Sequence, residues 1–190
     1  MQGDDTLVRL ARRVIEGDPE SLDKLLRELE PLVVRTVRLI VGSGSWAAED
    51  AAQDALLDVV RGIQTLRAPE AVRTWALRVA STRAIKVARR ERLLSLRRAA
   101  LIDPVLAVEP ADGRSAALKE AFDRLPPKLR AIAVLRLHVG LSEAETAGVM
   151  GCSLGTVKSN LHDARKRLAA SLGARGFAPA ASKRCVEEIA

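Results

Sequence analysis

The chain has 190 residues, of which 31 are Lys or Arg and 24 are Asp or Glu, so its formal net charge is +7 at neutral pH. Hydrophobic residues make up 48%, which excludes a disordered chain, and the basic balance favours a polyanionic partner. Aromatic residues reach only 2%, which argues against an aromatic-lined cofactor pocket or a stacking platform for RNA bases.

The cysteine content and the N-terminus indicate the compartment. Cys152 and Cys185 are too few for a disulfide framework and indicate a reducing environment. The N-terminal residues are acidic and then amphipathic, unlike a signal peptide. The most apolar stretch, residues 31–41, is interrupted by Arg35 and Arg38, so it cannot span a bilayer. We therefore expect a cytoplasmic protein that has no membrane segment.

Apolar residues recur at three- and four-residue steps through the first half of the chain, which is typical of amphipathic helices. Asp18 followed by Pro19 predicts a helix start, and Gly42 predicts its end. No segment alternates with period two, so no strand is predicted. The predicted helices of this block are residues 6–16, 19–42, 46–66 and one that begins near residue 69.

Turn-forming pairs, among them Asp103-Pro104 and Asp112-Gly113, break the helical pattern and predict an interdomain linker over residues 94–115. A second helical block follows, and residues 174–190 form a predicted tail. The predicted helices of this block are residues 116–125, 128–139, 142–150 and 153–172. The sequence thus predicts an all-α fold with two small helical domains, residues 1–93 and 116–173.

The second domain ends in a helix, a tight turn at Gly151 and a longer helix capped by Ser153, which is the order of a helix-turn-helix. An ordinary hairpin of two helices is the alternative. The residues predicted to face the core are Val157, Leu161, Ala164 and Leu168. The candidate DNA-binding residues of the last helix are Ser153, Thr156, Lys158, Ser159, His162, Arg165 and Lys166.

Charge is unevenly distributed along the first domain. Eight basic residues and one acidic residue lie between Arg78 and Arg98, which favours phosphate binding over a merely solvated face. An acidic cluster lies between Glu49 and Asp58, where carboxylates four residues apart repel one another mildly. We expect basic residues of a partner to relieve that repulsion.

Two sets of motifs resemble the extracytoplasmic-function (ECF) sigma factors of bacteria, a group of the sigma-70 superfamily. Two segments resemble region 4 of this family: LPPKLRAIAVLRL (125–137) and GCSLGTVKSNLHDARKRL (151–168). Three segments resemble region 2: GDPESLDKL (17–25), AEDAAQD (48–54) and VRTWALRVA (72–80). The two sets stand in the family's order.

The resemblance implies an RNA polymerase sigma factor, which directs core RNA polymerase to promoters and aids their opening. It implies that region 2 docks on the β′ clamp and opens the −10 element, and that region 4 reads the −35 element and lies on the β flap. It also implies an anti-sigma factor as a partner. A catalytic site, a cofactor, a bound metal and a small-molecule substrate are not expected.

Site residues follow from the same resemblance. A loop at residues 64–70 is expected to form part of a pocket for a flipped base, and Trp75 is expected to lie mainly in the core. The expected −10 contacts are Trp75, Arg78, Thr82, Arg83, Lys86, Arg89 and Arg90. The expected contacts with core polymerase are Glu49, Asp50, Gln53, Asp54 and Asp58.

The chain departs from the family at several positions. An aromatic residue is usual where the chain has Val60, Val72 and Glu143. Thr82 and Lys86 differ from the usual residues in the −10 segment, and Asn160 stands where an arginine is common.

Two other classes of protein remain as alternatives. A stand-alone helix-turn-helix repressor or response-regulator output domain leaves the N-terminal motifs without explanation. An all-α enzyme or scaffold lacks candidate catalytic residues, and His138, His162 and Cys152 do not have the spacing of metal ligands.

Overall fold

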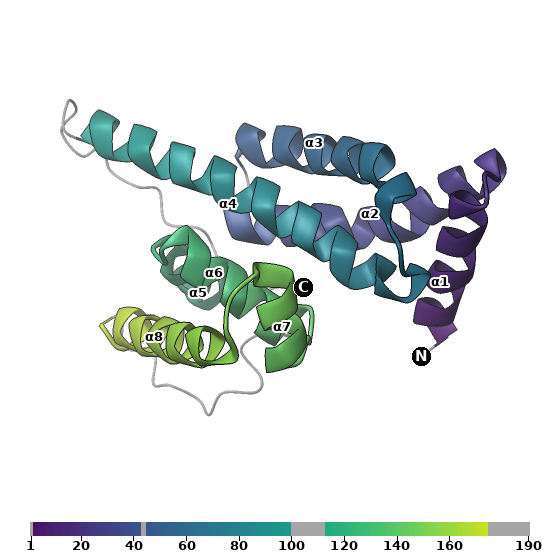
Figure 1. Cartoon of the computed structure of the whole chain (residues 1–190). Coiled ribbons are helices and arrows are strands. Elements are labelled where there is room, and N and C mark those ends of the chain that lie inside the picture. The colour runs from purple at the N-terminus through teal and green to yellow at the C-terminus, as the bar shows by residue number, and fades with distance from the viewer. Residues whose placement is uncertain (1, 43–44, 100–112, 175–190) are drawn as a thin grey trace. The chain divides into compact units, whose positions relative to one another are not determined.

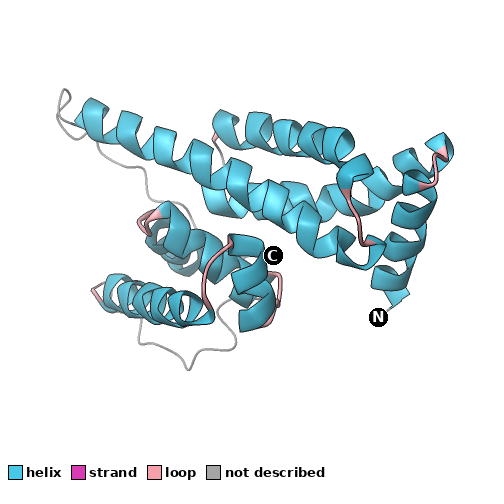
Figure 2. Cartoon of the chain, viewed as in Figure 1, coloured by secondary structure: helices cyan, strands magenta, loops and turns pink. Residues whose placement is uncertain are grey.

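The computed structural model describes residues 2–42, 45–99 and 113–174. These residues form helices joined by short turns, and no strand occurs among them (Figure 2). The predicted all-α fold is confirmed. None of the helices is both long enough and apolar enough to cross a lipid bilayer, within the residues described.

The chain divides into two compact units, and the division falls after Val87. The first contains α1, α2, α3 and most of α4, and the second contains α5, α6, most of α7 and α8 (Figure 1). Each unit is described separately below.

Helices α1 (Gln2–Ile15) and α2 (Pro19–Val41) pack against each other in the first unit. Asp18 is the N-cap of α2, as predicted, because its carboxylate accepts hydrogen bonds from the backbone N–H of Glu20 (3.1 Å) and the hydroxyl of Ser21 (2.7 Å). The hydroxyl of Ser21 is the main cause of the lowered pKa of Asp18. Helix α2 ends at Gly42, where a φ of 122° suits glycine.

Helix α3 (Trp46–Gly62) is shorter than predicted, because residues 63–66 leave the α-helix in a turn of 3-10 helix, η1 (Ile63–Thr65). A second such turn, η2 (Pro69–Ala71), leads into α4 (Val72–Ala99). Small residues build this part of the core. Buried alanines recur on α3 and α4: Ala48, Ala51, Ala52, Ala55, Ala76, Ala80 and Ala84. A core made of Ala, Leu, Val and Ile explains how the chain folds with so few aromatic residues.

Both ends of the predicted linker are helical. Residues 94–99 continue α4, since the run of Arg and Leu there contains good helix formers and neither Gly nor Pro. Residues 113–115 begin α5. Helix therefore extends into both ends of the predicted linker, whose bounds stay a prediction. Its middle, residues 100–112, lies outside the described residues, as does the predicted tail from residue 175.

The second unit consists of α5 (Gly113–Asp123), α6 (Pro127–Ala133), α7 (Glu143–Met150) and α8 (Leu154–Gly173). The helix predicted at 128–139 ends as a turn of π-helix, η3 (Val134–His138). Helix α8 packs against both α5 and α6. The shared core includes Ala121, Leu125, Ala133, Ala164 and Leu168.

Candidate nucleic-acid interface

Helices α7 and α8 and the turn between them form the predicted helix-turn-helix. Gly151 has a φ of 60°, a left-handed conformation that favours glycine and reverses the chain sharply. Ser142 and Glu145 cap α7 reciprocally, since the hydroxyl of Ser142 accepts from the N–H of Glu145 (3.1 Å) and the Glu145 carboxylate accepts from the N–H of Ser142 (2.7 Å). Ser153 caps α8 through the N–H of Thr156 (3.1 Å).

Helix α8 separates a buried face from a polar face. Val157, Leu161, Ala164 and Leu168 are all buried, which confirms the predicted core face. The predicted DNA-binding side chains that lie exposed on α8 are Lys158, Ser159, His162, Arg165 and Lys166. An α-helix with such a face fits the major groove of DNA.

Three hydroxyl groups at the start of α8 are bonded within the helix. The Ser153 and Thr156 hydroxyls lie 2.8 Å apart, and the Ser159 hydroxyl donates to the carbonyl of Thr156 at 3.2 Å. Asn160 donates to the same carbonyl at 2.7 Å, and its side chain is half-buried. Lys158 lies 3.8 Å from Glu143 on α7. These contacts shape the start of the helix, whereas His162, Arg165 and Lys166 have no ion pair in the described part of the chain.

Arg130 supports the second unit from inside, a role that the sequence analysis missed. Its side chain is 7% exposed. It donates to the carbonyl oxygens of Asp123 and Leu125, at the end of α5, and to the Asp123 carboxylate at 3.3 Å. Burial raises the pKa of Asp123 and lowers that of Arg130. The only signal in the sequence is an arginine within an apolar run after two prolines.

Helix α4 brings the predicted −10 residues onto one surface. Trp75, Arg78, Thr82, Lys86 and Arg89 fall within about 80° on a helical wheel of 3.6 residues per turn. All of these except Trp75 are exposed, as is Arg90. Arg83 lies to the side of this face and is half-buried.

Trp75 is half-buried rather than mainly in the core. Its indole lies against Gly62, since a Cβ built on Gly62 would stand 2.9 Å from the ring atom Cζ2. The expected base-pocket loop precedes it, and Gln64 of that loop donates to the carbonyl of Val14 at 3.1 Å. At the other end of the loop, Glu70 accepts from Arg12 at 3.2 Å. These two bonds tie the loop to α1.

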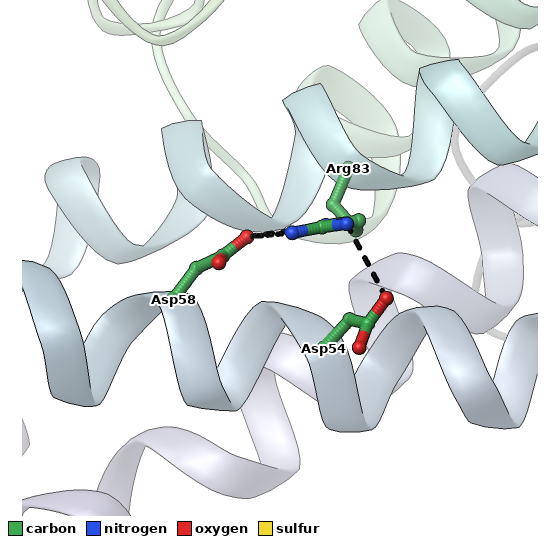
Figure 3. A network of polar contacts seen from close by, with 3 residues as sticks. All are labelled: Asp54, Asp58 and Arg83. Atoms are coloured by element: carbon green, nitrogen blue, oxygen red, sulfur yellow. Dashed lines mark hydrogen bonds and ion pairs between the residues drawn. The ribbon is translucent and has the colours of Figure 1, made fainter.

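The acidic cluster on α3 is neutralised largely within the chain. Arg38 of α2 donates to both oxygens of Glu49, at 2.8 and 2.7 Å, and these hydrogen bonds lower the pKa of Glu49. Arg83 of α4 donates to Asp58 through Nε (3.1 Å) and Nη2, and to Asp54 through Nη1 (3.3 Å) (Figure 3). The hydrogen bond to Asp58 raises the pKa of Arg83.

This pairing corrects the expectation that a partner relieves the carboxylate repulsion. Arginines of α2 and α4 already do so for Glu49, Asp54 and Asp58. Asp50 and Gln53 are exposed, and neither side chain has a hydrogen bond or ion pair to another described residue.

The described residues contain no cluster of His, Cys, Asp or Glu able to hold a metal ion. Cys152 is half-buried in the turn before α8, and Cys185 lies outside the described residues.

Comparison with known proteins gives two family matches in the same order as the two units. The model of Sigma-70 region 2 matches residues 25–93, and that of Sigma-70, region 4 matches residues 115–168. The ECF RNA polymerase sigma factor SigM of Mycobacterium tuberculosis is 34% identical over 165 residues, which cover 84% of this chain and 81% of that protein.

Two solved structures share the fold. CnrH, solved in complex with the cytosolic domain of CnrY, has a TM-score of 0.65 and 22% identity, covering 89% of this chain and 98% of that one. The sigma factor RpoE of Bartonella quintana, solved with the anti-sigma factor NepR, has a TM-score of 0.61 and 22% identity, covering 80% and 96%. With both sigma regions matched in order and with the similarity to SigM over most of its length, the chain belongs to the ECF sigma factors of the sigma-70 family.

Proposed function

We propose that this chain recognises promoters in two parts for RNA polymerase. Residues 1–93 serve as region 2, residues 116–173 serve as region 4, and residues 94–115 connect them. The observation that carries the proposal is the capped α8, whose polar face is exposed at the position of region 4. As in other initiation factors, the polymerase performs the chemistry, and this chain needs no catalytic site of its own.

Region 4 reads the −35 element through the polar face of α8. Lys158, Ser159, His162, Arg165 and Lys166 point toward solvent, where base edges and phosphates are within reach of a helix in the major groove. Ser153 and Thr156 hold the first turn, which aims the helix N-terminus at a phosphate. The same unit meets the β flap of the polymerase.

Region 2 opens the −10 element with the outer face of α4. Arg78, Lys86, Arg89 and Arg90 offer positive charge to the phosphates of the opening strands. Trp75 and Thr82 face the bases, and the loop at residues 64–70 receives a flipped base. Arg83, whose donors are bound to Asp54 and Asp58, acts instead by positioning α3.

The acidic cluster of α3 supports docking on the β′ clamp of core polymerase. Glu49, Asp50, Gln53, Asp54 and Asp58 lie on that helix. Asp50 has no ion pair to another described residue, so its carboxylate suits a basic surface. The chain works in the cytoplasm, where the polymerase is found. We also propose an anti-sigma protein as an inhibitor, because RpoE was solved with such a partner.

Reconstitution with core RNA polymerase tests this function. The purified chain is mixed with bacterial core enzyme and a library of genomic fragments, and transcript starts are mapped. We expect starts at a shared pair of sequence elements, and weak DNA binding when core enzyme is left out. Tight, specific binding by the chain alone, without initiation in any library, would identify a repressor instead.

A matched pair of variants connects initiation to α8. Arg165→Ala removes an exposed charge from the proposed −35 face, and we expect transcription to fall about tenfold or more, as for loss of one good base or phosphate contact. Arg124→Ala removes an exposed arginine that directly follows α5, outside that face, and is expected to leave transcription unchanged.

A further inference from the structure

Helix α1 packs against η1 and η2, the two 3-10 turns that bound the loop at residues 64–70, as well as against α2. The match to Sigma-70 region 2 begins at residue 25, so α1 stands outside it. Apolar side chains of both segments are buried: Leu7, Leu10 and Val14 of α1, and Ile63 and Leu66 of the loop region. The loop therefore has α1 as a wall of its own core.

Two polar contacts join the ends of the loop to the last turn of α1. At one end, the Gln64 amide donates to the carbonyl of Val14 at 3.1 Å. The last turn of a helix leaves carbonyl oxygens without donors of its own, and Gln64 supplies one. At the other end, Arg12 pairs with Glu70 at 3.2 Å. The loop is thus held on both sides of its middle.

A third contact lies at the other end of α1. Asp4, in the first turn, pairs at 3.5 Å with Arg73, which follows η2 at the start of α4. Contacts at both ends of α1 fix the direction of the segment as well as its place. Between them, the middle of the loop carries exposed residues: Thr65, Arg67 and Ala68.

The ion pair of Arg12 with Glu70 contributes little to the stability of the fold. The two side chains are 59% and 65% exposed, and pairs exposed to this degree are screened by water. A contact of this kind can still restrict how a loop moves. A loop held in its binding conformation loses less entropy when a ligand binds, and a flipped base is read by hydrogen bonds that depend on exact placement.

We propose that α1 positions the loop at residues 64–70 for reading one base of the −10 element, with Arg12 and Gln64 as positioning residues. The exposed middle of the loop meets the base, and α1 sets where that middle lies. The inference rests on the proposed function and adds to it a role for a helix outside the matched region 2.

Base preference at each position of the −10 element tests this role. A promoter found by the reconstitution above is prepared with its −10 element randomised and a barcode in the transcribed region. The full chain and core enzyme transcribe this library, and sequencing of the barcodes gives the preference at each position. A second library has the −35 element randomised instead.

We expect Arg12→Ala to lower the preference about twofold at one position of the −10 element, as for loss of an exposed ion pair. Gln64→Met removes the donor to Val14 at similar side-chain length and is expected to lower it about fivefold at the same position. Preferences at the other −10 positions and in the −35 library are expected to stay as in the wild type.

A charge exchange and a control on the same helix sharpen the test. Arg12→Glu and Glu70→Arg each place like charges together and are expected to lower the preference about fourfold, whereas the double variant restores the pair and the preference. Arg9→Ala removes an exposed arginine one turn away on α1 and is expected to behave like the wild type. Melting temperatures of all variants provide the check on folding.

The outcomes separate this inference from the proposed function. If the wild type initiates transcription and the Arg12 and Gln64 variants keep every base preference, the role of α1 is wrong and the proposed function stands. If preferences fall equally at all positions of both elements, α1 only supports the fold, and the inference is overturned. If the wild type initiates at no promoter, the proposed function fails and the inference fails with it.

Discussion

The indole of Trp75 occupies the space into which a side chain at Gly62 would project. A Cβ at residue 62 would stand 2.9 Å from Cζ2 of the ring, closer than carbon atoms pack. Gly62 has right-handed helical dihedral angles (φ −95°, ψ −16°), so its backbone does not require glycine. The space taken by Trp75 is therefore what excludes a side chain there.

Gly62→Ala is expected to displace Trp75 while the backbone stays helical. In a Trp46→Phe background Trp75 is the only tryptophan, so its fluorescence reports this site. We expect the emission to shift to longer wavelength as the ring moves into water. Promoter opening, followed by permanganate reactivity of unpaired thymines, is expected to decrease.

Gly148→Ala is the matched control, because a Cβ on Gly148 meets no atom within 4 Å. It is expected to leave the Trp75 emission as it is. An unchanged spectrum in Gly62→Ala would show that the indole has room to accommodate the methyl group.

The two ion pairs of Arg83, with Asp58 and with Asp54, are expected to contribute unequally to stability. Asp58 accepts from both Nε and Nη2, and its side chain is 32% exposed, whereas Asp54 accepts from Nη1 alone and is 54% exposed. Double-mutant cycles of urea unfolding should give a coupling of about 1 kcal/mol for Arg83 with Asp58 and less than about 0.5 kcal/mol with Asp54. Equal couplings would contradict the geometry.

The helices could be predicted because their signals are local. Asp18 and Ser153 are cap residues that immediately precede apolar periodicity, and both caps occur in the structure. The spacing from Val157 to Leu168 likewise placed the buried face of α8 correctly. Each of these features depends on residues within a few turns of one another.

The partners of the acidic cluster could not be predicted, because they depend on how helices cross. Asp54 and Asp58 lie four residues apart, so the sequence indicated repulsion alone. Arg83, which resolves it, is 25 residues from Asp58 and was assigned to phosphate by its position in a basic run. The helical pattern of the sequence weakens from about residue 94, whereas α4 continues to Ala99 because residues 94–99 are good helix formers.

The Arg38–Glu49 pair predicts a pH dependence. The folded-state pKa of Glu49 is lowered by the hydrogen bonds from Arg38, so the pair contributes stability above the unfolded pKa of glutamate, about 4.3. That contribution is lost as the pH falls through the lowered folded value. Free energies of unfolding measured from pH 6 to about pH 3 should therefore fall less steeply in Glu49→Gln than in the wild type.

Glu20→Gln is a control for that titration, since Glu20 is an exposed carboxylate at the start of α2. Its pH profile is expected to follow the wild type more closely than that of Glu49→Gln. Parallel profiles for Glu49→Gln and the wild type would mean that the ion pair does not persist in solution.

Ser153 allows capping and DNA contact to be separated. Ser153→Ala removes the acceptor for the N–H of Thr156 and is expected to destabilise the second unit by about 1 kcal/mol. Ser153→Asp keeps an acceptor at the N-cap and is expected to preserve stability, but its charge repels phosphate. In Ser153→Asp, urea unfolding should therefore show the stability of the wild type, whereas transcription that depends on the −35 element should be reduced.

Arg130→Met is expected to have the largest effect on stability. The buried guanidinium donates to the carbonyls of Asp123 and Leu125, and methionine fills much of the same space without a donor. Two carbonyls at the end of α5 then lose their partner, at a cost of about 2–4 kcal/mol by urea unfolding. Arg124→Met, at an exposed residue that directly follows α5, is expected to cost less than about 0.5 kcal/mol. Similar losses for the two variants would show that the interior of the second unit does not depend on Arg130.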